Sequence, residues 1–181
     1  MRTCRASAAG KLTVVLATLL LTVTACGGGG PSPRAWAASV CEALTPWRAE
    51  ISKLTSSTRQ QMTAQTTPAQ ARENLVRLFD GARQASETAR REVERAGVPE
   101  TTGGDQISAG FRGSLSRMRD AYGRARDTIR GLDTSQPATF YDGVQTAVES
   151  LNKEYDASAL DTSRLSSTEL KAAFDEVPEC R

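Results

Sequence analysis

Residues 105–131, DQISAGFRGSLSRMRDAYGRARDTIRG, indicate the fold class of this 181-residue chain more clearly than any other stretch. Apolar side chains recur there at helical spacing: Ile107, Phe111, Leu115, Met118, Tyr122, Ala125 and Ile129. The spacing places them on one face of a helix, whereas a half-buried strand would alternate every second residue. We therefore expect an amphipathic helix with Asp105 as its N-cap and Gly131 at its end.

The segment before residue 61 carries a similar apolar stripe, which contains a proline. Its members are Trp36, Val40, Leu44, Trp47, Ile51 and Leu54. Pro46 lacks the backbone N–H that a helix interior needs, and Thr45 precedes it as a possible cap of a new turn. The sequence therefore predicts a kink or a break at Pro46.

Three further helices are indicated by their boundaries. Thr67-Pro68-Ala69-Gln70 is a capping-box pattern with proline at the first helical position, and Gly97-Val98-Pro99 ends that helix. A fourth helix follows Pro137, and its apolar stripe comprises Tyr141, Val144, Val148, Leu151 and Tyr155. Ser166-Ser167-Thr168-Glu169 predicts a second capping box, which opens a short fifth helix through Leu170, Phe174 and Val177.

These segments predict an all-α fold, an up-and-down four-helix bundle with a short C-terminal fifth helix. Short connections make consecutive helices antiparallel neighbours, and an even number of long helices returns the chain to its starting end. The fifth helix can then bring Cys180 to Cys41, and we expect a disulfide between them. Metal binding is the alternative for these two cysteines. It is the weaker one, because two thiolates do not fill a tetrahedral site and the chain has no histidine.

The N-terminus has the three parts of an export signal. Basic residues (Arg2, Arg5 and Lys11) precede an apolar stretch over residues 12–23, which is short for a bilayer span. Val23-Thr24-Ala25-Cys26 then resembles the lipobox of bacterial lipoproteins, in which the cysteine thiol is acylated and the signal is cut before it. We therefore expect residues 1–25 to be a cleaved signal, 26–33 a lipidated cysteine with a Gly/Pro tether, and 34–181 the helical domain. A plain secretory signal is the alternative.

Removing such a signal changes the charge of the chain. It holds three of the 23 basic residues and no acidic residue, so 20 basic residues remain against 21 acidic ones, a net charge of −1. The basic character of the whole chain is thus no indication of nucleic-acid binding. We expect the protein at the outer face of the cell membrane, attached by a palmitate-type lipid on Cys26.

The helical part also resembles a group of small secreted proteins and lipoproteins of high-GC Gram-positive bacteria. The resemblance is carried by Trp36-Ala37-Ala38-Ser39-Val40-Cys41, Leu44-Thr45-Pro46-Trp47, the Gly97-Val98-Pro99 break and the late Cys180. It covers most of residues 34–181. It implies a helical, extracytoplasmic protein, and it carries over no catalytic residues.

The sequence holds no recognisable catalytic, metal or cofactor motif. Without histidine the commonest general base and metal ligand is missing, and no nucleophile elbow or phosphate-binding glycine loop occurs. Glu87, Glu92 and Glu94 alternate with arginines and predict ion pairs within their helix. We therefore expect a non-enzymatic module without cofactors, which binds or scaffolds an envelope protein or anionic polymer. A small-ligand binding or sensing lipoprotein, with a pocket between helices, is the alternative.

Four arginines form a row along the third helix: Arg112, Arg119, Arg126 and Arg130. They lie beside its apolar stripe. A functional interpretation is contact with an anionic lipid or polymer surface. The structural interpretation, which we favour, pairs them with the acidic residues of the fourth helix: Asp142, Glu149 and Asp156 repeat every seven residues, as the first three arginines do.

Overall fold

The computed structural model describes residues 29–158, 160 and 165–180, which form an all-α fold. Its helices are α1 (Pro33–Gln61), α2 (Pro68–Arg95), α3 (Gly104–Gly131), α4 (Pro137–Asp156) and α5 (Thr168–Glu176), followed by the 3-10 turn η2 (Pro178–Cys180). The described residues contain no β-strand, and the all-α prediction is confirmed. The predicted signal and Cys26 lie outside the described residues. No helix in the described part is long and apolar enough to cross a membrane.

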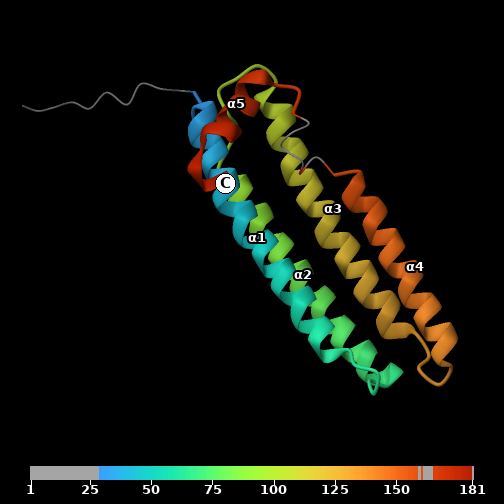
Figure 1. The fold of residues 1–181 in the computed structure, drawn as a ribbon. Coiled ribbons are helices and arrows are strands. Elements are labelled where there is room, and N and C mark those ends of the chain that lie inside the picture. The colour runs from blue at the N-terminus through green and yellow to red at the C-terminus, as the bar shows by residue number, and fades with distance from the viewer. Residues whose placement is uncertain (1–28, 159, 161–164, 181) are drawn as a thin grey trace, which may run out of the picture.

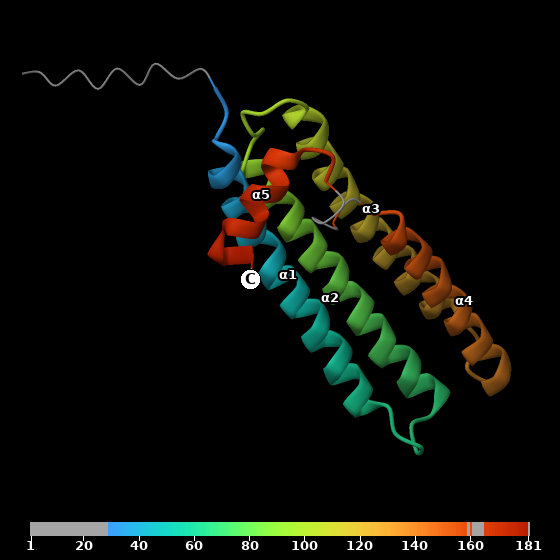
Figure 2. The same cartoon turned by 45° about the horizontal axis from the view of Figure 1, so that its top comes forward.

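The four long helices lie side by side in chain order, each antiparallel to the one before it (Figures 1 and 2). α2 and α3 form the most extensive pair, with α1 packed on α2 and α4 packed on α3. α4 meets α2 over a short stretch only, and extensive packing of α4 on α1 is not found among the described residues. The closed four-helix bundle therefore stays a prediction. α5 and η2 pack on α1.

Helix α1 continues through its proline, so the break expected at Pro46 is not found, and the alternative, a kink, stays a prediction. Pro46 lies inside a single helix of 29 residues. The hydroxyl of Thr45 does not cap a new turn but donates to the backbone carbonyl of Glu179, at 3.3 Å. The tertiary contacts of α1 with α2, α5 and η2 thus outweigh the local cost of the proline.

Two of the three predicted helix starts shift by one or two residues. Thr67 and Gln70 form the predicted capping box of α2. The N-cap of α3, in contrast, is Gly103 with φ of 74°, and Asp105 lies in the first turn. The N-cap of α5 is Ser167, whose hydroxyl accepts from the Leu170 N–H. In α3 the positive φ at position 103 favours glycine, which adopts it without strain. The helix therefore begins two residues before the N-cap expected at Asp105.

Three aromatic rings of the core meet between α1, α3 and α5. The rings of Trp36, Phe111 and Phe174 form edge-on and stacked pairs with centroids 5.5–6.0 Å apart. The Trp36 indole donates to the Gly97 carbonyl at 3.0 Å, and the Ser108 hydroxyl donates to the same oxygen at 2.8 Å. This carbonyl therefore joins the end of α2 to α1 and α3.

Helix α4 packs on the core through Val144, Val148 and Leu151 of its predicted apolar stripe, but the two tyrosines of the stripe do not lie in the core. Phe140 and Ala147 are its buried residues, whereas Tyr141 and Tyr155, which we expected in the core, are 42% and 52% exposed. A Cβ at Gly143 would lie 2.6 Å from a methyl of Leu132. The bare backbone of Gly143 thus allows a close approach to Leu132, on the same side of α4 as the buried Phe140.

Candidate functional site

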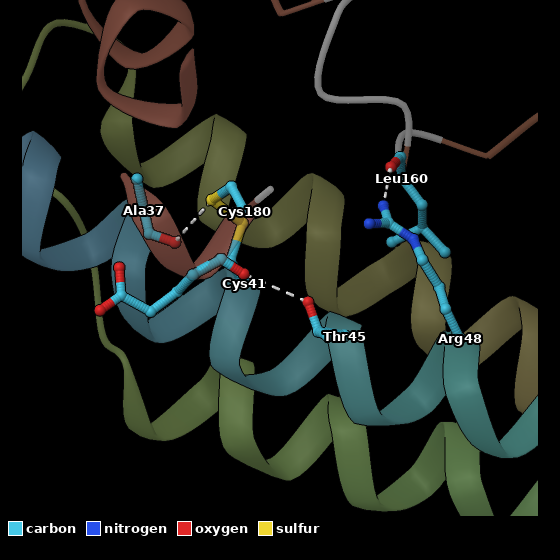
Figure 3. The surroundings of a disulfide bond; sticks show 7 residues. Ala37, Cys41, Thr45, Arg48, Leu160 and Cys180 are labelled. Atoms are coloured by element: carbon cyan, nitrogen blue, oxygen red, sulfur yellow. Dashed lines mark hydrogen bonds between the residues drawn. A yellow bond between two sulfur atoms is a disulfide. The ribbon is translucent and has the colours of Figure 1, made fainter. Parts of the chain in front are cut away.

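The predicted disulfide between Cys41 and Cys180 is present and joins α1 to η2. The Sγ–Sγ distance is 2.02 Å and the Cα atoms are 5.0 Å apart. Neighbouring contacts tie the C-terminal part to the same face of α1: Thr45 binds the Glu179 carbonyl, and an Arg48 Nη donates to the Leu160 carbonyl at 3.5 Å (Figure 3). The bond thus fixes the last turn of the chain to α1.

Two arginines of the row on α3 bind carboxylates of α2. An Arg119 Nη lies 2.9 Å from Glu87, and an Arg126 Nη lies 2.8 Å from Asp80. The two arginines are seven residues apart, and so are the two carboxylates, as expected for antiparallel helices in register. We call these two pairs the ion-pair ladder.

The ladder corrects the predicted partner of the row, which was α4. Among the described residues, the ion pair between α3 and α4 is Arg124–Glu154 at 3.0 Å. Arg130, the last member of the row, pairs with Asp127 in its own helix at 3.3 Å. The sequence did contain the correct signal, because Asp80, Glu87 and Glu94 also repeat every seven residues. The arginines beside Glu87 and Glu94 in the sequence predict ion pairs within α2 instead, and this local pattern masks the longer repeat.

Those pairs within α2 are present as well. Glu87 accepts from Arg90 at 3.0 Å and from Arg91 at 2.8 Å, and Arg90 also reaches Glu94 at 3.0 Å. Glu87 therefore binds arginines of both helices.

Arg112 is the member of the row without an ion pair in the described part of the chain. The register of the ladder places it opposite Glu94, but that carboxylate is bound by Arg90. The Nε of Arg112 is buried and has no hydrogen-bond partner there. The predicted contact with an anionic surface stays a prediction for the row, and Arg119 and Arg126 already donate to carboxylates of the fold.

The ladder shifts the titration of its carboxylates. Arg90 and then Arg119 hold the pKa of Glu87 far below its ordinary value by hydrogen bonding to the ionised form. Arg126 likewise lowers the pKa of Asp80. Both carboxylates are thus poor proton donors or acceptors near neutral pH, and they serve as structural anions.

The outer face of α4 differs from the α2–α3 face in its charge pairing. Tyr141 and Tyr155 are the exposed large hydrophobic residues of the described chain, and both lie on this helix. The carboxylates of Asp142 and Asp156 are exposed, and among the described residues neither has an ion-pair partner. α4 therefore offers aromatic rings and free negative charge to solvent.

Two hollows lie elsewhere on the surface. One of about 440 Å³ runs between α1 and α2, and its wall includes Trp47 with the carboxylates of Glu42, Glu50 and Glu92. Another of about 610 Å³ lies at the loop before α3 and the start of α5, and it is lined largely by hydroxyl-bearing residues such as Thr101 and Ser167. In the second hollow the Thr101 hydroxyl donates to the Glu169 carboxylate at 2.5 Å, and among the described lining residues neither hollow has a histidine or lysine beside such a pair.

No group of three or more metal-ligating side chains occurs within the described ranges. Comparison of the chain with models of protein families, with curated proteins and with solved structures finds no match.

Proposed function

We propose that this protein is a lipid-anchored, extracytoplasmic helical module that binds an envelope partner and has no catalytic activity. Cys26 at the end of a lipobox-like segment is the proposed attachment point. The disulfide supports an oxidising compartment, because such bonds persist there and are rare in the cytosol.

The observation that carries the binding role is the composition of α4. Its two exposed tyrosines combine apolar area with a polar tip, the property that enriches this residue in interfaces. Asp142 and Asp156 beside them have no ion-pair partner among the described residues. A protein surface with basic residues matches both features, whereas an anionic polymer would be repelled.

Paired variants test this surface. We expect Tyr141→Ser with Tyr155→Ser to abolish capture of the partner from solubilised envelopes. The melting temperature should fall by only a few degrees, because the residues are 42% and 52% exposed and the ring contact that is lost is the one of Tyr141 with Phe140. Asn152→Ala on the same helix is the matched control and should leave capture intact. Capture by the double variant at the level of the unmodified protein would refute α4 as the binding surface.

The anchor has its own test. Cys26→Ser should abolish incorporation of radiolabelled palmitate and should shift the protein from the membrane fraction to the medium. Persistent membrane fractionation of this variant would contradict the proposed attachment.

Turnover of a peptidoglycan, ester or phosphoester substrate by the purified protein would contradict the non-enzymatic role.

The hollow between α1 and α2 supports one alternative, a lipoprotein that binds or senses a small ligand. Its wall joins the Trp47 ring to three carboxylates, so an organic cation fits its chemistry. Ala85→Phe would fill the hollow from α2. Under this alternative, a cation that raises the melting temperature of the unmodified protein no longer does so in the filled variant.

A further inference from the structure

The chain before α1 is attached to the helical body. The Glu100 N–H donates to the Pro31 carbonyl at 2.9 Å, which joins this segment to the loop between α2 and α3. The Ser32 hydroxyl then caps α1 by accepting from the Ala35 N–H. We call Gly29–Ser32 the docked segment.

The glycines of the docked segment have a packing role. A Cβ at Gly30 would lie 1.9 Å from the Val98 carbonyl oxygen, a distance that no side chain can occupy. At Gly29 it would lie 2.9 Å from the Glu100 carboxylate. The sequence predicts a Gly/Pro tether over residues 27–33, but at Gly30 the missing Cβ lets two backbones approach closely, and at Gly29 it leaves room for the Glu100 side chain.

The loop that receives this segment is itself held by the core. Gly97, at φ of 76°, turns the chain out of α2, and its carbonyl accepts from Trp36 and Ser108. Trp36 is fully buried. The docked segment therefore moves with the helices and does not act as a hinge.

We propose that, on a lipid surface, the protein stands on the end formed by the docked segment and residues 97–104, with its helices directed away from the bilayer. This inference rests on the proposed lipid at Cys26. Three Cα–Cα steps of 3.8 Å separate Cys26 from Gly29, so the lipid-bearing residue lies within about 11 Å of this end. A free tether of seven residues would allow about twice that distance.

The opposite end then lies far from the lipid. The 28 residues of α2 span about 42 Å, and the α1–α2 and α3–α4 loops are at the end remote from α5 (Figures 1 and 2). In this orientation the outer face of α4 extends along the long axis of the molecule, away from the bilayer. Partners standing tens of ångströms from the membrane are therefore within its reach.

Neutron reflectometry on a supported phosphatidylcholine bilayer tests this orientation. The chain from Cys26 is coupled through its one free thiol to a maleimide lipid, with Cys41 and Cys180 oxidised. We expect a protein layer about 45 Å thick, whereas a molecule lying flat gives about 20–25 Å, the width of two helices. Coupling supplies the anchor whether or not cells acylate Cys26, so palmitate labelling remains an independent test of the proposed function.

Three variants assign the orientation to the docked segment. Gly30→Val places a side chain against the Val98 carbonyl. It should reduce the thickness of the protein layer and broaden the distribution of orientations within it. An eight-residue Gly/Ser insertion between Gly28 and Gly29 should do the same without touching any described contact, which covers the case that Gly30→Val fails to fold. Gly131→Ala is the control, because a Cβ there meets no atom within 4 Å.

A layer of 20–25 Å for the unmodified chain overturns the proposed orientation. An unchanged thick layer for the insertion variant also overturns it, since the short connection would then be irrelevant. A thick layer that is lost in the insertion variant and retained in Gly131→Ala supports it.

Discussion

At the residue scale, Glu87 is the carboxylate on which the charges of α2 and α3 converge. Arg90, Arg91 and Arg119 all donate to it, and its side chain is 21% exposed. Glu87→Gln keeps the shape but removes the charge. We expect the free energy of unfolding to fall by roughly 1–2 kcal/mol, between the values typical of exposed and of buried ion pairs. Urea denaturation at pH 7 measures this change.

The same carboxylate predicts how stability depends on pH. The folded state holds the pKa of Glu87 below its unfolded value, so the ion pairs stabilise the protein above about pH 4 and are lost as the pH falls further. Between pH 7 and pH 3 the melting temperature should therefore drop less in Glu87→Gln than in the unmodified protein. Asp142→Asn, at a carboxylate without an ion pair in the described residues, should keep the full drop. Equal drops in both variants would contradict the ladder.

Arg119 and Arg112 form a matched pair on the same row of α3. Arg119→Glu places a negative charge against Glu87 and should lower the free energy of unfolding by at least about 2 kcal/mol. Arg112 has no ion pair in the described part of the chain, so Arg112→Glu breaks none there and should lower the free energy of unfolding by less, about 1 kcal/mol for a half-buried charge opposite Glu94. Chemical denaturation of both variants decides this point: equal losses would mean that Arg112 also has an ion-pair role in the fold.

At the scale of the element, the proline of α1 makes a direct prediction. Pro46 leaves the Glu42 carbonyl without its helical donor, and its ring is exposed, so little packing is lost when it is replaced. Pro46→Ala should therefore raise the free energy of unfolding by about 1–3 kcal/mol. Ala49→Gly, one turn later on the exposed side, is the control and should lower it by about 1 kcal/mol. A loss of stability in Pro46→Ala would mean that the proline itself supports α1.

Local sequence signals predicted where the helices begin better than which face of each helix is buried. The Thr67 capping box could be read from four residues because it acts within one turn. Phe140 and Tyr141 are adjacent apolar residues that fit helical spacing equally well. Which of them faces inward is a matter of tertiary contacts, such as the close approach of Gly143 to Leu132 in the loop before α4, and periodicity does not contain these contacts.

The candidate site, too, could be predicted from the sequence only in part. The Cys41–Cys180 pair followed from composition and helix count. The partner of the arginine row did not, because two acidic rows of equal spacing, on α2 and α4, were available to it. Only the register of α2 against α3 selects Asp80 and Glu87.

At the scale of the whole molecule, the disulfide links residues 139 positions apart. Cys41→Ala with Cys180→Ala should lower the free energy of unfolding by about 2–5 kcal/mol, since the bond restricts the unfolded chain. Thermal denaturation of the double variant measures this loss, and reduction of the unmodified protein should reproduce it. A melting temperature unaffected by either treatment would mean that the core alone holds η2 on α1.

The central claim, a lipid-anchored module closed by one disulfide, is tested most directly by the intact mass of the protein taken from cell membranes. We predict the mass of a chain that begins at Cys26, carries diacylglycerol on that residue and lacks the two hydrogens of a Cys41–Cys180 bond. The mass of a chain that retains residues 1–25, or of one without lipid, would contradict it.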